Sequence, residues 1–407
     1  MQEEGCKPAC GTIEAMKAEA KTLGAYVQVP FCQTKCTYCN FHTGVVSRER
    51  YAPYAAAVCR EVAETARLRG TIGEEATAID TIYLGGGTPS LLAAAALKDI
   101  LDALQRNFGF ASVLADAPET TLEADPETIT REKALAWIAA GLNRVSLGVQ
   151  SFSDLELKAS GRMHRRADIF AAADMLRGAG FKNISMDLIA GLAHQTRESW
   201  EQSLAQLVEI RPEHVSIYML EIDEGSHLGK ESLAGGSRYG ADAVPTDDAI
   251  ADSYEQARKQ LRVAGYEHYE ISNWGLPGFR SRHNLKYWRR EPYLGFGAGA
   301  HSYAGGKRWA NAHDSARYVA CIEQGMSPRE QEQVVTQAEA LEEELFLGLR
   351  QLDGVDLARI ERVYNVDLAE RVSSLRKQGL VETDGRQLRL APDHLAVSNS
   401  VLVELLS

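Results

Sequence analysis

Three cysteines crowd into a short stretch near the start of the chain, at Cys32, Cys36 and Cys39. This Cys-x3-Cys-x2-Cys spacing directly follows an apolar, strand-like run and supplies three thiolates to a cubane [4Fe-4S] cluster, whose fourth iron is left without a protein ligand. The amino and carboxylate groups of S-adenosylmethionine (SAM) can chelate such an open iron, which positions the sulfonium for one-electron reductive cleavage. A zinc knuckle is the alternative, because His42 is in range as a fourth ligand.

A run of glycines gives a second chemical signal, in the segment YLGGGTPS at residues 83–90. Three consecutive glycines after an apolar strand let a ligand approach the backbone closely, with free N–H groups at the start of the next helix. The segment matches neither the P-loop nor the dinucleotide-binding spacing. The dinucleotide spacing does occur at residues 295–300 (GFGAGA), but we expect no buried strand before it and no βαβ unit after it, so nicotinamide-nucleotide binding is disfavoured.

Polar residues stand at or just beyond the ends of several strand candidates, at Glu123, Gln150, Arg162 and Asp187. Their side chains are suited to holding the ribose hydroxyls and the carboxylate of SAM. Each has an ordinary structural explanation when taken alone, such as a helix cap for Glu123 or a surface cation for Arg162. Only their common position at strand ends favours a binding site.

The elements that must position these residues are six βα units between residues 25 and about 222, where short apolar runs alternate with stretches of helical period. The strand candidates are residues 25–31, 78–87, 117–126, 143–152, 183–192 and 214–223. Ligands bind at the carboxyl ends of parallel strands, so the polar residues should converge on one face. Six units do not close an eight-unit barrel. We therefore expect an α/β fold with a partial (β/α)6 barrel, and residues 266–274 as an extra strand.

The domain organisation expected from these patterns is an N-terminal arm at residues 1–24, a core with covering segments at 25–310 and a C-terminal domain at 311–407. The C-terminal part is helical and then forms a hairpin around Asp384, which predicts a small helical, winged-helix-like domain. Residues 331–407 hold 8 Lys and Arg against 14 Asp and Glu, which favours packing or partner docking over DNA binding. The glycine-rich segment 223–245 is expected to be a mobile loop.

Composition limits the classes of function. The chain has 407 residues, a formal net charge of −12 and no long Lys/Arg cluster, so we expect no nucleic-acid partner. No apolar run approaches the roughly 20 residues that cross a bilayer, and the start lacks a secretory signal, which predicts no membrane span and a cytoplasmic location. Seven cysteines in so long a chain favour a metal site in a reducing compartment over disulfides.

The motifs together resemble one known family. The segments YVQVPFCQTKCTYCNF, GGGTPS, TLEADP, NRVSLGVQSF, GRMH, DLIAGL, YEISNW and HNLKYW are similar to the oxygen-independent coproporphyrinogen III oxidase-like radical SAM proteins, and the likeness runs from about Tyr26 to the C-terminus. The resemblance implies that Cys32, Cys36 and Cys39 bind the cluster. It also implies that SAM is contacted by Tyr26, Tyr38, Gly86, Gly87, Thr88, Glu123, Gln150, Arg162 and Asp187.

Two branches of this family must be separated. The true oxidases carry another cysteine two residues after the third, where this chain has Phe41, and a longer segment than the 25 residues that precede Tyr26 here. The segment HNLKYW at residues 283–288 is similar to the HNxxYW motif of the heme chaperone branch, in which the histidine is associated with heme. The resemblance therefore implies that His283 and Trp288 bind heme. His42, His164 and His301 are competing candidates that rank below His283.

The resemblance favours a heme chaperone that binds a [4Fe-4S] cluster, SAM and heme and transfers heme to an unidentified acceptor protein. An electron donor is a further expected partner, peripheral membrane contact is compatible with the family, and the chain is expected to be a monomer or a homodimer. The alternative is a coproporphyrinogen III oxidase that acts by SAM-derived radical oxidative decarboxylation. Whether SAM is cleaved stays open at this point.

Overall fold

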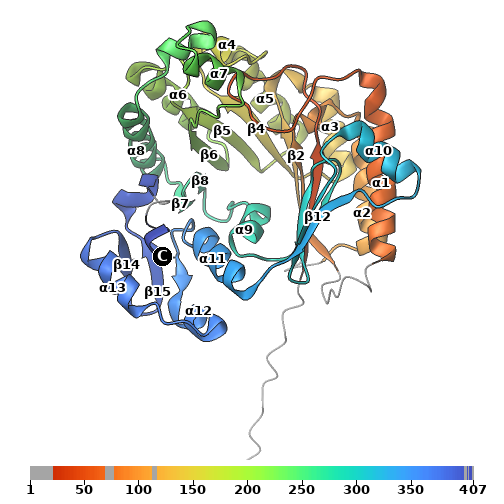
Figure 1. Cartoon of the computed structure of the whole chain (residues 1–407). Helices are drawn as coiled ribbons and strands as arrows, with labels where there is room; N and C mark the ends of the chain where they lie inside the picture. The colour runs from red at the N-terminus through yellow and green to blue at the C-terminus, as the bar shows by residue number, and fades with distance from the viewer. Residues whose placement is uncertain (1–21, 69–77, 112–116, 398–400, 402, 406–407) are drawn as a thin grey trace, which may run out of the picture.

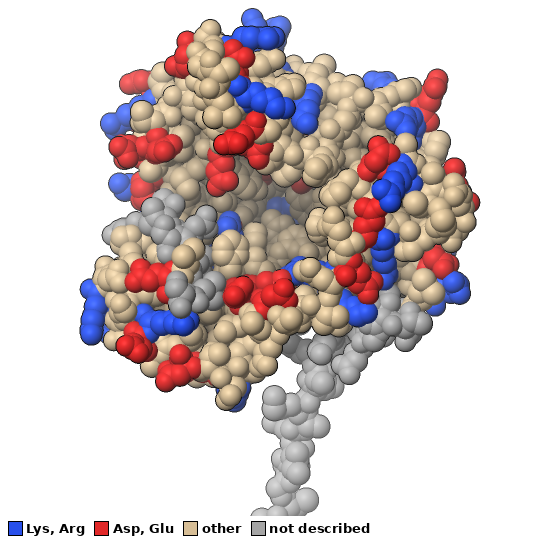
Figure 2. Space-filling model, in the orientation of Figure 1, with Lys and Arg blue, Asp and Glu red and all other residues tan. Residues whose placement is uncertain are grey.

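The structure is a computed structural model that describes residues 22–68, 78–111, 117–397, 401 and 403–405. Most of the expected N-terminal arm, with Cys6 and Cys10, lies outside the described residues. Within the described part of the chain, no helix is both long enough and apolar enough to cross a membrane. Figure 2 shows acidic and basic side chains interspersed around a hollow in the middle of the molecule.

Six parallel strands alternate with helices, as the sequence predicts (Figure 1). The strands are β1 (Leu23–Val29), β2 (Ile79–Gly86), β3 (Glu119–Ala124), β4 (Arg144–Gln150), β5 (Ile184–Ala190) and β6 (His214–Met219). The helices between them are α1 (Tyr51–Arg67), α2 (Ala94–Phe108), α3 (Arg131–Ala140), α4 (Asp154–Ala159), α5 (Arg166–Ala179) and α6 (Arg197–Ile210). Each strand pairs with the next in parallel register, which confirms the partial (β/α)6 barrel.

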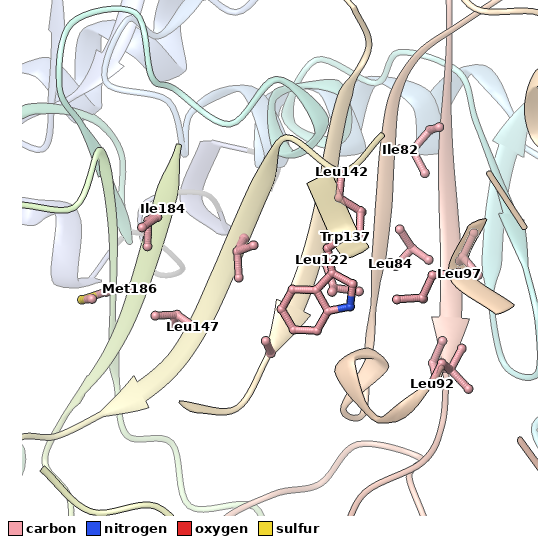
Figure 3. Close-up of a cluster of buried hydrophobic side chains, with 14 of the residues drawn as sticks. Ile82, Leu84, Leu92, Leu97, Leu122, Trp137, Leu142, Leu147, Ile184 and Met186 are labelled. Atoms are coloured by element: carbon pink, nitrogen blue, oxygen red, sulfur yellow. The ribbon is translucent and has the colours of Figure 1, made fainter. Parts of the chain in front are cut away.

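The two faces of this sheet differ in polarity because side chains alternate along a strand. One face carries apolar residues such as Ile82, Leu122 and Met186, which pack with Trp137 of α3 in the core under the helices (Figure 3). Tyr83, Glu123 and Asp187, the neighbours of those three apolar residues in sequence, point to the other face. A polar inner face beside an apolar outer face indicates that the inside of the barrel holds a ligand rather than a core.

Additional strands extend the sheet at both edges to twelve strands. At one edge β8 (Asn273–Gly275) pairs antiparallel with β6 and with β7 (Glu267–Glu270), so the extra strand expected at residues 266–274 is present as two short strands. At the other edge β9 (Tyr293–Phe296) pairs parallel with β1 and is followed by β10 (His301–Ala304), β11 (Lys307–Asn311) and β12 (Arg329–Val334).

Two local expectations are wrong. A buried strand, β9, does enter the GFGAGA segment, but an antiparallel strand follows it instead of the helix of a βαβ unit. Segment 223–245 is not simply a loop, since it contains α7 (His227–Leu233) and the 3-10 helix η5 (Arg238–Ala243). The side chain of Ser226 accepts a hydrogen bond from Gly229 N and so caps α7. This N-cap was overlooked in the sequence because the segment is rich in glycine. Helix α8 (Asp247–Val263) follows.

The C-terminal part has a core of its own. It comprises α11 (Gln337–Gly348), β13 (Val355–Asp356), α12 (Leu357–Tyr364), α13 (Ala369–Lys377), β14 (Val381–Thr383), β15 (Gln387–Leu390) and η6 (Pro392–Val397). The three strands form a separate sheet beside the helices, which matches the winged-helix-like expectation. Since α10 (Ser315–Glu323) and β12 still accompany the large sheet, we propose that this domain begins near residue 335 rather than at 311.

Candidate functional site

A cavity of about 440 Å³ lies at the carboxyl ends of the barrel strands. Its lining includes all three cysteines of the Cys-x3-Cys-x2-Cys segment and, of the residues expected to contact SAM, Tyr38, Gly86, Gly87, Thr88, Glu123, Gln150, Arg162 and Asp187. Tyr26 does not line the cavity, because its side chain is turned toward Gln28 and its hydroxyl donates to that amide oxygen. Residues from separate parts of the sequence therefore meet in one place, as parallel strands require.

The cysteines lie on the loop that follows β1. Backbone hydrogen bonds hold this loop at both sides: Cys32 N donates to Gly44 O at 3.1 Å, and Thr37 N donates to Ser160 O at 3.1 Å. Burial raises the pKa of the Cys32 thiol, and hydrogen bonds from Thr43 and Thr88 oppose that rise. Burial likewise raises the pKa of Cys36, against the pull of the Arg162 charge. A bound metal centre would favour the thiolate forms of Cys32 and Cys36 against this effect of burial.

The positions of His42 and the three cysteines can be compared with those that a zinc site would require. His42 does not line the cavity that holds the thiols. Among the described residues, no group of three His, Cys, Asp or Glu side chains is close enough together to hold a single metal ion. A cubane cluster has no such requirement, because each cysteine binds a different iron atom. The donor set therefore fits a [4Fe-4S] cluster better than one zinc ion.

The glycines after β2 make room beside the cysteine loop. A Cβ atom on Gly87 would lie 2.6 Å from the carbonyl oxygen of Phe31 and 2.8 Å from that of Val29, so a side chain cannot be fitted there. Gly86 has a φ of +107°, and its N–H donates to Oε2 of Glu123 at 3.0 Å. The glycines are therefore needed for the close approach of this turn to the backbone of the cysteine loop, and the approach of a ligand to the same backbone stays a prediction.

Two half-buried carboxylates face the cavity. Glu123 also accepts a hydrogen bond from the hydroxyl of Tyr83 at 2.9 Å, and burial raises its pKa to about 7. Asp187 lies within 3.3 Å of the hydroxyl of Ser146, and burial raises its pKa as well. Both carboxylates are acceptors held in a low-dielectric site, where a ligand that donates hydrogen bonds or carries positive charge would be bound strongly.

Arg162 supplies the positive charge at the cavity wall. Its Nη1 donates to Oδ1 of Asp125 at 2.8 Å and its Nη2 to Gly148 O at 3.2 Å, while its buried Nε has no hydrogen-bond partner among the described residues. A Cβ on Gly148 would lie 2.7 Å from Nη2, so this glycine leaves space for the guanidinium. The unpaired donor on a buried arginine fits a carboxylate ligand that the structure does not contain.

Asp125 is a site residue that the sequence analysis missed. Its second oxygen accepts from the hydroxyl of Thr88 at 3.0 Å, so one carboxylate joins Arg162 to the glycine-rich turn. Thr88 is the N-cap residue of the 3-10 helix η3 (Pro89–Leu91), but its side chain caps nothing and bonds Asp125 instead. The signal for Asp125 was its place in TLEADP, one residue beyond the strand end.

The histidine of HNLKYW lies elsewhere. His283 is at the start of α9 (Arg282–Trp288), fully buried among Tyr26, Tyr83 and Tyr287 rather than in the cavity. Its Nδ1 lies 2.9 Å from the Thr81 hydroxyl and its Nε2 lies 2.8 Å from the Tyr287 hydroxyl, and burial lowers its pKa to about 3. Neither ring nitrogen is free to bind iron in this conformation.

The other residues expected near heme do not lie beside His283. The indole of Trp288 lies under the guanidinium of Arg350, whose central carbon is 4.9 Å from the ring centroid. His164 is buried, with Nε2 3.1 Å from Val149 O. His42 and His301 are both exposed.

Comparison with known proteins shows to which family the chain belongs. Residues 26–207 match the Radical SAM superfamily, and residues 335–393 match the HemN C-terminal domain. The chain is 34% identical to heme chaperone HemW of Bacillus subtilis (strain 168) over 382 residues, which cover 93% of this chain and 97% of that protein. It is 36% identical to heme chaperone HemW of Synechocystis sp., over 87% of this chain and 84% of that protein.

The chain belongs to the HemW family. Its fold is also that of coproporphyrinogen III oxidase (HemN) from Escherichia coli, with a TM-score of 0.80 and 22% identity over 95% of this chain and 90% of that one. The HemW relatives match in sequence over nearly the whole chain, whereas the HemN likeness shows the shared fold. Membership of the radical SAM superfamily implies a [4Fe-4S] cluster and SAM as cofactors.

Proposed function

We propose that this HemW family protein is a heme chaperone, which binds a [4Fe-4S] cluster, SAM and heme and passes heme to an acceptor protein. The observation that carries the cofactor part is the single cavity that unites three thiols, the glycine turn and Arg162. The heme part is supported by relatives named heme chaperone HemW that align over nearly their whole length.

In this proposal Cys32, Cys36 and Cys39 bind the cluster. Arg162 takes the carboxylate of SAM, Glu123 and Asp187 accept hydrogen bonds from its ribose hydroxyls or ammonium group, and Gly86 and Gly87 let it reach the backbone. When bound and reduced, such a cluster would supply the electron for reductive cleavage of SAM. The protein orients SAM and limits its contact with water.

The proposed cofactors and the proposed heme transfer predict which partners the protein needs. A reduced cluster requires an electron donor, and heme delivery requires an acceptor protein. The thiols of the cluster loop must stay reduced before assembly, which favours the cytoplasm. We propose a monomer or a homodimer, and peripheral contact with a membrane is compatible with this function.

The experiment is an anaerobic heme titration of cluster-reconstituted full-length protein, followed by transfer to apomyoglobin as a generic acceptor. We expect saturable binding near one heme per chain and transfer to the acceptor. Absence of saturable binding would remove the chaperone function.

The same samples distinguish a heme chaperone from the alternative function, a coproporphyrinogen III oxidase. Turnover of coproporphyrinogen III under reducing conditions, without specific heme binding, would establish an oxidase and contradict the proposal. A Phe41→Cys variant is a useful companion, since it restores the cysteine of the oxidases; we expect it to bind heme as the wild type does and to gain no turnover.

A further inference from the structure

A second cavity, of about 290 Å³, lies between the C-terminal domain and the large sheet. Helix α11, which forms one wall, lies beside α9 (Figure 1). Four aromatic side chains line the cavity, those of Tyr287, Tyr293, Tyr303 and Phe346, and Phe346 is 40% exposed although it is a large hydrophobic residue. These four residues do not line the cluster cavity, so the two sites are separate. We call this second site the aromatic cavity.

Two arginines meet at the wall of the aromatic cavity and share one carboxylate. Arg290 Nε donates to Oε2 of Glu343 at 2.9 Å, while Arg308 donates to Oε1 through Nε at 2.6 Å and to Oε2 through Nη2 at 2.8 Å. The arginine side chains are 10% and 26% exposed. Both guanidinium groups also lie over the ring of Tyr303, with their central carbons 5.3 Å and 4.5 Å from its centroid. Two shielded cations beside an aromatic ring suit a planar ligand that carries carboxylates.

Glu343 stands where a carboxylate of such a ligand would bind. Burial acts to raise the pKa of Glu343, but hydrogen bonds from Arg308 and Arg290 outweigh it and lower the pKa. Glu344 lies 3.8 Å from Arg290 and also pairs with Arg359. Three arginines therefore share two carboxylates here, which leaves one positive charge of the five residues without a counterpart.

The backbone of Arg290 is held in an unusual conformation. This residue follows the C-cap of α9, and its φ is +51°, in the left-handed region where glycine is the usual choice. Its Nη1 donates to the Tyr364 hydroxyl at 3.1 Å and its Nη2 to the Tyr303 hydroxyl at 3.0 Å, so the guanidinium has a fixed direction. Arginine at a position that favours glycine indicates that the side chain itself is needed at this wall.

The aromatic cavity borders the histidine of HNLKYW through Tyr287. The hydroxyl of Tyr287 lies 2.8 Å from Nε2 of His283, and the same tyrosine lines the cavity, with its ring edge-on to Tyr293 at 4.6 Å between centroids. Rotation of the Tyr287 side chain would therefore open Nε2 to the cavity. A ligand held by the two arginines would lie next to the imidazole that the motif led us to expect as an iron ligand.

We propose that the aromatic cavity binds the carboxylate edge of heme, with Arg290 and Arg308 taking the propionates in place of Glu343 and with the macrocycle against Tyr303 and Phe346. Heme is taken as the ligand from the proposed function, on which this inference rests. The cavity is smaller than a whole heme, so the rest of the macrocycle requires α11 to move away. Bound heme and docked α11 therefore compete for the same two arginines.

The first test breaks one ion pair from each of its two sides. Anaerobic hemin titrations of cluster-reconstituted full-length protein, followed by absorption, compare the wild type with Arg308→Gln, Glu343→Gln and the control Lys307→Gln. The control removes the neighbouring cation of β11, whose pair with Glu332 is more exposed. A purely structural role of the ion pair would change hemin affinity in the same direction in Arg308→Gln and Glu343→Gln.

Competition for the arginines predicts opposite directions. Arg308→Gln should bind hemin about tenfold more weakly or worse, because it loses a charged hydrogen-bond donor to the propionates. Glu343→Gln should bind hemin several-fold more tightly, because the competing carboxylate is gone, and loss of the fold cannot produce such a gain. Lys307→Gln should bind hemin as the wild type does.

Hemin dimethyl ester supplies the ligand side of the test, because its esterified propionates carry no charge. In the same detergent-containing buffer, the wild type should bind the ester about tenfold more weakly than hemin. Arg308→Gln should bind both compounds with similar affinity, and Arg308→Lys, which keeps the charge, should retain part of the preference. Hydrogen exchange in α11 of the wild type should increase when hemin binds.

Three results would overturn the inference while leaving the heme chaperone intact. Equal affinity of the wild type for hemin and its ester would show that no propionate is recognised, and a full preference in Arg308→Gln would place the propionates elsewhere. Weaker hemin binding in both Arg308→Gln and Glu343→Gln would make the ion pair a structural contact. If the wild type binds neither compound saturably, the proposed function fails and this site fails with it.

Discussion

The Nη1 atom of Arg162 lies 2.8 Å from Oδ1 of Asp125, and this ion pair stands at the wall of the cluster cavity. The other oxygen of Asp125 accepts from Thr88, so one carboxylate orients both the cation and the turn that would face SAM in the proposed site. Side-chain exposures of 11% and 21% keep the pair largely away from water. Such a charge-assisted contact fixes the direction of the guanidinium.

Asp125→Asn should therefore weaken SAM binding although Asp125 was not among the expected contacts. Loss of a hydrogen bond to a charged group is worth about 1.5–3 kcal/mol, which corresponds to roughly 10- to 100-fold in Kd. Equilibrium SAM binding to reconstituted protein measures this change. Asp102→Asn, which alters an exposed Lys98 pair on α2, is the matched control and should bind SAM normally.

The affinity for SAM should depend on pH through Glu123. Burial raises the pKa of this carboxyl to about 7, so without ligand it is protonated below that value and ionised above it. An ionised carboxylate binds the donor groups of SAM better, and affinity should rise as pH increases from 6 to 8. Binding titrations across this range test the expectation. Glu123→Gln should bind more weakly at pH 8 and show a flatter profile; an equally steep profile in the variant would assign the titration to another group.

The free energy of unfolding should depend on pH through Glu61, whose contacts lie on the β12 side of the sheet. Its buried carboxylate accepts from Tyr318 Oη and Asn311 Nδ2, each at 2.6 Å, and from Gly297 N at 2.8 Å. Burial raises its pKa from 4.5 to about 7. Since the folded state holds the proton more tightly, this contribution to stability is present below pH 4.5 and is lost as pH rises through 7.

The measurement is the thermal unfolding midpoint of wild type and Glu61→Gln between pH 5 and 8. The variant should be less stable, by about 1–3 kcal/mol, because an amide cannot accept all three hydrogen bonds. Its midpoint should also change less with pH than that of the wild type. Parallel curves for the two proteins would show that Glu61 does not titrate in this window.

Glu343 should tie the C-terminal domain to the sheet. Glu343 lies on α11 and accepts hydrogen bonds from Arg290 Nε at 2.9 Å and from Arg308 Nε at 2.6 Å. Arg290 precedes β9 and Arg308 lies on β11, so the contact joins α11 to the large sheet. Glu343→Gln should loosen this contact and increase hydrogen exchange in α11. Glu332→Gln removes a partner of the more exposed Lys307 and is the control. Equal exchange in both variants would mean that apolar packing alone holds the domain.

The barrel and its binding residues could be predicted because their signals are local. Each βα unit carries its own periodicity, and Glu123 or Asp187 stands at the end of a visible strand. Strand β9 could not be found this way, since it pairs with β1 from nearly 270 residues further along the chain and is only four residues long. Its pairing is set by tertiary packing rather than by propensity.

The buried position of His283 also could not be predicted from the sequence. The sequence placed it beside aromatic residues, which fits a heme pocket and a packed core equally well. Only the structure shows Thr81 and Tyr287 at its two nitrogens. The contacts of His313 with His42 and His301 could not be predicted for a similar reason, because these residues meet only after the sheet has formed.

The EPR spectrum of the reduced, reconstituted protein, recorded with and without SAM, tests the central claim most directly. We predict about four irons per chain and a spectrum that changes when SAM is added, because in the proposed site SAM would bind the iron that Cys32, Cys36 and Cys39 leave open. Cys39→Ala should abolish the signal. Bound zinc without sulfide, or a cluster spectrum that SAM does not alter, would contradict the account.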